Sequence, residues 1–151
     1  MKIKFFIIAL LILLNGCGYS PIYNSKDSSY KISNIETLNN NKLLNLLRNK
    51  ILVTSNENAL RIIKIELDFQ EDINVILKDK KGNPSKNRIS IVVNLKVLEG
   101  GNIIVKQNFS KSFEYNVASN KSNMFEYENN IKKNLISDIS QDITFLLATI
   151  R

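Results

Sequence analysis

Few side chains in this sequence could do chemistry. The chain contains no histidine and a single cysteine, Cys17, so the commonest general base, the usual zinc ligands and the Ser-His and Cys-His nucleophile pairs are missing. Two pairs of carboxylates, Glu71 with Asp72 and Glu126 with Glu128, remain as candidates for metal binding or acid-base work. Solvated surface charge is the simpler interpretation of both pairs. We therefore expect no enzymatic activity, no metal site and no cofactor.

Basic side chains gather in one stretch of the sequence. Residues 78–88 include five basic side chains together with Gly82 and Pro84, which mark a turn. Clustered lysine and arginine attract phosphates and acidic sugars as charged hydrogen-bond donors. The candidate ligand contacts are Lys80, Lys81, Lys86 and Arg88, with Lys121 as a weaker candidate. The sequence favours the alternative that these charges keep a hairpin tip soluble and discourage strand pairing.

The N-terminus offers an explanation for the lone thiol. Lys2 and Lys4 precede an uninterrupted apolar run of ten residues, 5–14. A membrane-spanning helix needs roughly 20 apolar residues, whereas a secretory signal has about 7–15 behind a basic start. The four residues that end at Cys17, LNGC, resemble the bacterial lipoprotein signal. This resemblance implies that Cys17 is lipidated and that residues 1–16 are removed as a signal peptide.

Two other interpretations of this region stay open, namely that Cys17 is an ordinary buried thiol or that the apolar run remains as an uncleaved anchor. Gly18 stands where related signals have aspartate for retention in the inner membrane, so we expect the outer membrane. Residues 17–29 then form a lipidated tether and residues 30–151 a single domain. Because an exported chain rarely meets nucleic acid, its net charge of +7 is expected to meet anionic lipids or phosphorylated sugars.

Helical spacing of apolar residues predicts two helices. The first covers residues 39–53, with N-cap candidates at 39–41. The second runs from 124 to 147 or beyond, and Asn123 with Glu126 three residues later predicts a capping box at its start. Both helices have one apolar stripe, which we expect to face a common core.

Alternating apolar residues predict strands. The expected extended segments are 30–35, 60–69, 73–78, 89–98 and 103–115. Gly100-Gly101 is a hairpin signal, because paired glycines tolerate the positive φ of tight turns. The returning strand is long enough that we expect it either to project beyond the core or to bend at a bulge between residues 106 and 112. The sequence therefore predicts an α+β fold in the order β-α-β-β-β-α, with two helices packed on a mostly antiparallel or mixed four-stranded sheet.

The whole arrangement resembles the lipopolysaccharide-assembly lipoprotein family. The resemblance is carried by the opening CGYSPIY from Cys17, by residues 87–98 with the glycine turn that follows them, and by the segments FEYN from Phe113 and FEY from Phe125. It implies a lipid-anchored protein of the cell outer membrane, facing the periplasm or inside a barrel lumen. Its partner would be the outer-membrane β-barrel lipopolysaccharide transporter, which it plugs and helps to assemble. Its ligand would be lipopolysaccharide.

Two non-enzymatic alternatives to this function remain. A periplasmic lipid carrier would need an apolar cavity in place of a closed core. An envelope-tethering structural lipoprotein would bind the cell-wall polymer. Uptake of a hydrophobic dye and sedimentation with wall material distinguish these two from a barrel partner.

Overall fold

The computed structural model describes residues 28–38, 41–118 and 120–150, and of Lys121 the backbone alone. Six elements follow one another in the predicted order: β1 (Tyr30–Thr37), α2 (Lys42–Leu52), β2 (Arg61–Lys78), β3 (Pro84–Glu99), β4 (Asn102–Asn116) and α3 (Lys121–Thr149). The four strands form one mixed sheet. The predicted α+β fold is therefore confirmed.

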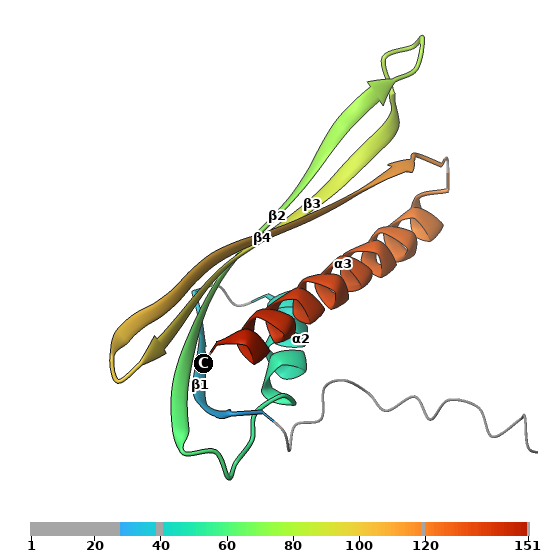
Figure 1. Cartoon of the computed structure of the whole chain (residues 1–151). Helices are drawn as coiled ribbons and strands as arrows, with labels where there is room; N and C mark the ends of the chain where they lie inside the picture. The colour runs from blue at the N-terminus through green and yellow to red at the C-terminus, as the bar shows by residue number, and fades with distance from the viewer. Residues whose placement is uncertain (1–27, 39–40, 119, 151) are drawn as a thin grey trace, which may run out of the picture.

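The sheet has the strand order β1-β2-β3-β4, with β1 parallel to β2 and the other neighbours antiparallel. Parallel strands need a crossover connection, which α2 provides between β1 and β2. Both helices lie on the same face of the strongly twisted sheet, and the joined ends of β2 and β3 reach beyond β4 (Figure 1). Among the described residues, no helix covers the other face of the sheet.

Between the sheet and the helices lies one apolar core. On each strand it is built from alternate residues, and on each helix from one stripe, as the periodicity predicts. Its fully buried members include Leu44, Leu47 and Ile51 of α2, Ile65 and Leu67 of β2, Ile91, Val93 and Leu95 of β3, and Ile136, Ile139, Ile143 and Leu147 of α3. Burial of these side chains supplies the main force that holds the helices on the sheet.

The start of α2 agrees with the sequence and the start of α3 does not. The Asn41 side chain accepts a hydrogen bond from the Leu43 backbone N–H at 2.8 Å, as expected of an N-cap. The N-cap of α3 is Asn120, which accepts from the N–H of Ser122 and Asn123. The capping box predicted at Asn123 was wrong, because asparagine three residues earlier offers the same cap to a longer helix.

Two expectations about the strands were also wrong. The segments 60–69 and 73–78 are one strand of 18 residues, and β3 begins at Pro84, so the expected loop 78–88 is reduced to a short turn. Pro84 is tolerated there because the first residue of a strand can lack a donor. Residues 78–88 have the composition of a turn, but Lys86 and Arg88 are paired with residues of β4 in the sheet.

The hairpin between β3 and β4 was predicted correctly, but its bulge was not. Gly100 and Gly101 have φ of 56° and 86°, which glycine adopts without strain. In the register of the two strands, Val97 faces Val105 and Leu98 faces Ile103, so the extra residue lies beside the turn and not between 106 and 112. The register shift is confined to the turn end of the hairpin, so the rest of β4 is paired regularly with β3.

Candidate functional site

The turn that joins β2 to β3 is held by the carboxylate of Asp79. Its Oδ1 accepts hydrogen bonds from the backbone N–H of Lys81 at 2.8 Å and of Asn83 at 2.9 Å. Hydrogen bonds from Asn83 are the main reason that the pKa of Asp79 is lowered. Gly82 supplies the positive φ of 86° that the turn needs. The tip is therefore a defined turn that displays Lys80 and Lys81 to solvent.

The four basic residues predicted as a ligand contact do not form one cluster. Lys80 and Lys81 are exposed at the tip, and neither makes an ion pair with any residue that the structure describes. Lys86 and Arg88 lie on β3 and both contact Glu114 of β4, with the Lys86 Nζ and the Arg88 Nη2 each 2.6 Å from a carboxylate oxygen. The tip pair is thus available to an anion, whereas the strand pair already shares the carboxylate of Glu114.

Glu114 responds strongly to these two neighbours. Hydrogen bonds from Lys86 and then Arg88 lower the pKa of Glu114 from 4.5 to about 2. The carboxylate therefore stays charged at any physiological pH. A ligand phosphate at this position would have to displace Glu114 or lie beside it, which makes Lys86 and Arg88 poor anion contacts.

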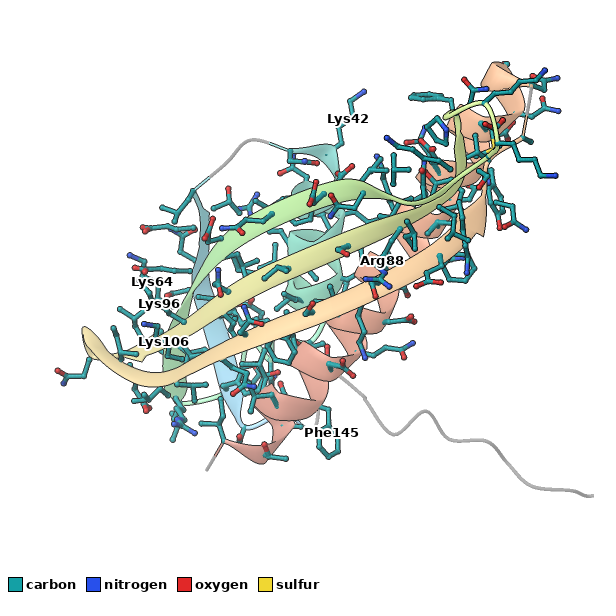
Figure 2. The ribbon with its side chains drawn as sticks, turned by 90° about the horizontal axis from the view of Figure 1, so that it is seen from above. Lys42, Lys64, Arg88, Lys96, Lys106 and Phe145 are labelled. Atoms are coloured by element: carbon teal, nitrogen blue, oxygen red, sulfur yellow. The ribbon has the colours of Figure 1, made fainter. Side chains whose placement is uncertain are left out.

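A second basic group lies on the sheet face that the helices leave uncovered. Lys64 of β2, Lys96 of β3 and Lys106 of β4 gather there, apart from Lys42 at the start of α2 (Figure 2). Lys96 and Lys106 stand directly opposite each other in the β3–β4 register. Like charges in this position destabilise a sheet, and an anion bound between them would remove that repulsion.

The acidic residues around this group compensate it only in part. The Lys64 Nζ lies 2.9 Å from a carboxylate oxygen of Glu36. The hydrogen bond that Lys64 donates to Glu36 is the main reason that the pKa of the Lys64 ammonium is raised. Lys96 reaches Glu66 at 3.7 Å. Lys106 makes no ion pair within the described ranges, so it is the cation of this face with most to gain from an anionic ligand.

A shallow groove of about 310 Å³ lies beside these lysines. It is lined by Leu38, Glu66, Leu67, Asp68, Asn94, Lys96 and Lys106. Across it the Asn94 amide donates to Asp68 at 3.2 Å, and the Asn108 amide donates to Asn94 at 2.7 Å. Ammonium and amide donors beside carboxylates are the groups that bind phosphates and sugar hydroxyls.

Sequence reasoning assigned the alternate residues of these strands to solvent and stopped there. The glycine turn contained the missing information, because a hairpin closed at Gly100-Gly101 must bring residues near 96 and 106 together. Lys96 lies four residues before Gly100 and Lys106 five residues after Gly101, so the turn brings them near each other and the bulge brings them directly opposite. The third member of the group, Lys64, depends on the β2–β3 register, which no turn of the sequence specifies.

The paired carboxylates are separated by the fold. Glu71 makes an ion pair with Lys132 of α3, whereas Asp72 accepts a hydrogen bond from the Asn74 amide. Glu128 accepts a hydrogen bond from the Tyr115 hydroxyl. Among the residues described here, no group of three or more acidic, histidine or cysteine side chains could hold a metal ion.

Four of the predicted features lie wholly or mostly outside the described residues. Cys17 and the signal peptide 1–16 belong to the undescribed N-terminal segment, as does most of the tether 17–29, and the side chain of Lys121 is likewise not described. Within the described part of the chain, no helix is both long enough and apolar enough to cross a membrane.

Solved structures share this fold at low sequence identity. Lipoprotein B of Nitrosomonas europaea has a TM-score of 0.64 at 12% identity, covering 87% of this chain and 91% of its own. A minor lipoprotein of Acinetobacter baumannii has a TM-score of 0.62 at 14% identity, covering 78% of this chain and 90% of its own. Rare lipoprotein B of Shewanella oneidensis has a TM-score of 0.61 at 13% identity, covering 79% and 95%.

No protein-family model and no curated protein sequence matches the chain. The comparisons therefore show a shared fold. The chain is similar in its α+β architecture to bacterial proteins that are named lipoproteins.

Proposed function

We propose that this protein is a non-enzymatic lipoprotein of the outer membrane, anchored through Cys17, that partners the β-barrel which inserts lipopolysaccharide into the outer leaflet. The observation that carries the proposal is the polar sheet face without a helix. A plug must present polar groups to a polar barrel interior, and this face has Lys64, Lys96 and Lys106 among polar neighbours. The fold shared with named lipoproteins and the CGYSPIY opening support the anchor.

Lipopolysaccharide is the proposed ligand, because it is anionic through phosphates or acidic sugars. Two surfaces are suited to it, the tip with Lys80 and Lys81 and the opposed pair of Lys96 and Lys106. A lysine near an anionic lipid surface contributes about 1 kcal/mol to binding. Removing two of them should therefore weaken lipopolysaccharide binding about tenfold or more.

Three double variants separate the candidate contacts. We expect the K80Q/K81Q and K96Q/K106Q variants to bind lipopolysaccharide more weakly in a direct titration. The K86Q/R88Q variant should lose less affinity than either, because both side chains are already held by Glu114. A control with Lys42→Gln and Lys133→Gln removes two exposed lysines from the helices. An equal loss of affinity in the control would mean that only net charge matters. A loss confined to K86Q/R88Q would contradict the assignment of the contact to the other two lysine pairs.

A periplasmic lipid carrier is the second candidate function, but the filled core does not favour it. The side chains of α2 and α3 that face the sheet are fully buried against it. A carrier would have to open this core to hold an acyl chain. Uptake of a hydrophobic dye by the folded protein, with the helices still formed, would favour the carrier over the barrel partner.

A further inference from the structure

At one end of the domain, apolar side chains are exposed on the otherwise polar sheet face. Leu60 is 99% exposed and Ile62 is 55% exposed at the start of β2. Ile103 and Ile104 are 56% and 37% exposed at the start of β4. We call these four residues the apolar end patch. Further along the same face, the groove-lining residues are mainly charged or amide side chains.

The sheet register shows that the members of the apolar end patch belong to one end. Leu98 pairs with Lys64 on one side and with Ile103 on the other, so Lys64 and Ile103 are two strand spacings apart and Ile62 lies two residues nearer the start of β2. The bulge beside the turn places two isoleucines opposite the single Leu98. This bulge therefore adds an apolar residue at a position where a regular hairpin would have none.

The chain enters the domain at the same end. Tyr30, the first residue of β1, pairs with Arg61, which lies between Leu60 and Ile62 of the patch. The Arg61 guanidinium binds both carboxylate oxygens of Glu99 at 2.8 and 2.9 Å and donates to the Ile150 carbonyl at 2.9 Å. These bonds hold β2, β3 and the end of α3 together next to the patch. The entry point of the tether and the exposed apolar side chains are thus adjacent and rigidly connected.

The tether limits how far this end can lie from a lipidated Cys17. Eleven residue steps separate Cys17 from Ser28, a span of at most about 40 Å in a fully extended chain. An anchored domain therefore presents this end to the bilayer at high effective concentration. A cluster of exposed apolar side chains rarely persists on a protein surface without a partner.

We infer that the apolar end patch is a membrane-contact surface that inserts into the phospholipid layer holding the anchor. The inference rests on the lipid anchor of the proposed function and adds an orientation to it, with the β3–β4 hairpin towards the bilayer and the β2–β3 tip away from it (Figure 1). Acyl chains are apolar, so the transfer of exposed leucine and isoleucine side chains from water into them is favourable.

Charge contributes little to this contact. Lys31, which pairs with Ile62 in the sheet register, forms an ion pair with Glu57 at 2.6 Å, and Lys64 forms one with Glu36 at 2.9 Å. The basic residues nearest to Ile62 are thus compensated locally. The contact should therefore form on zwitterionic lipid and persist at high salt, unlike one made by a polybasic surface.

The absence of tryptophan from the sequence allows a direct test. The acylated full-length chain with Ile103→Trp is placed in phosphatidylcholine vesicles that contain brominated phosphatidylcholine, which quenches tryptophan in contact with acyl chains. Phe125→Trp is the matched control, because Phe125 is also exposed, at 68%, but lies at the opposite end in α3. We expect a blue shift and quenching for Ile103→Trp and neither for Phe125→Trp.

A second set of variants tests the apolar origin of the contact. In the Ile103→Trp chain, Leu60→Asp and Ile62→Asp together should abolish the quenching. Without these two aspartates, 1 M salt should leave the quenching of the Ile103→Trp chain unchanged. Absent quenching in the Ile103→Trp chain, equal quenching in the Ile103→Trp and Phe125→Trp chains, or loss in high salt would each overturn the inference. Copurification of a barrel reports the proposed function separately, so either result can fail without the other.

Discussion

The packing of α3 on the sheet predicts that a small buried side chain matters more than a large exposed one. Ile139 is fully buried in the core, whereas Phe145, six residues later on the same helix, is 61% exposed and points to solvent (Figure 2). Ile139→Ala removes three carbon groups, worth about 0.8 kcal/mol each. The cavity left behind adds to this, so the free energy of unfolding should fall by about 3–4 kcal/mol. Phe145→Ala should cost about 1 kcal/mol or less.

Urea unfolding followed by circular dichroism measures both changes. Since a domain of this size unfolds with a slope of about 1–3 kcal/mol per molar urea, the Ile139→Ala midpoint should fall by about 1–4 M, and the Phe145→Ala midpoint much less. An equal or larger loss for Phe145→Ala would refute the reasoning. It would mean that α3 presents a different face to the sheet, and the placement of every α3 residue would have to be revised.

Three further predictions concern single sites. Gly101→Ala should lower the melting temperature, because its φ of 86° disfavours a side chain by about 1–2 kcal/mol although no atom lies within 4 Å of the added carbon; an unchanged melting temperature would contradict this. The pKa of Glu114, about 2 in the folded protein against 4.5, means that its stabilisation is present above pH 4.5 and is lost as the pH falls towards 2. In the K86Q/R88Q variant the pKa of Glu114, measured by NMR titration, should return towards 4.5. An unchanged value would rule out the two ion pairs. Burial raises the pKa of Tyr115 from 10 to about 12. The stabilisation linked to this shift is therefore present below pH 10 and is lost as the pH rises towards 12. Phenolate forming near pH 10, in a difference absorbance titration against Tyr115→Phe, would contradict this.

The elements that the sequence predicted correctly are those whose burial is one-sided. Alternation of apolar residues from Ile63 to Phe69 located the buried face of β2, and the spacing of Ile131, Leu135, Ile139 and Ile143 located that of α3. In each case the period of the apolar residues equals the period of the element, because only one face meets the core. The paired glycines located the β3–β4 turn for an equally local reason, the positive φ that they permit.

The errors arose where pairing across strands outweighs local composition. Residues 84–88 have the composition of a loop, yet Lys86 and Arg88 extend β3 because β4 provides partners and Glu114 lies between them. The same pairing divided the predicted basic cluster into a tip without ion pairs and a strand pair that shares one carboxylate. The ion pair of Lys132 with Glu71 was likewise not predicted, since β2 continues beneath α3 beyond the region that alternation had marked as buried.

The measurement that tests the central claim most directly is copurification of the protein with its partner. The full-length chain, tagged after Arg151, is recovered from detergent-solubilised outer membranes and washed with salt, and mass spectrometry identifies the retained proteins and the state of Cys17. The account predicts an acylated Cys17 and a large β-barrel in near one-to-one amount. Recovery of the acylated chain without any barrel would contradict the proposed function and would favour the lipid carrier or the wall tether.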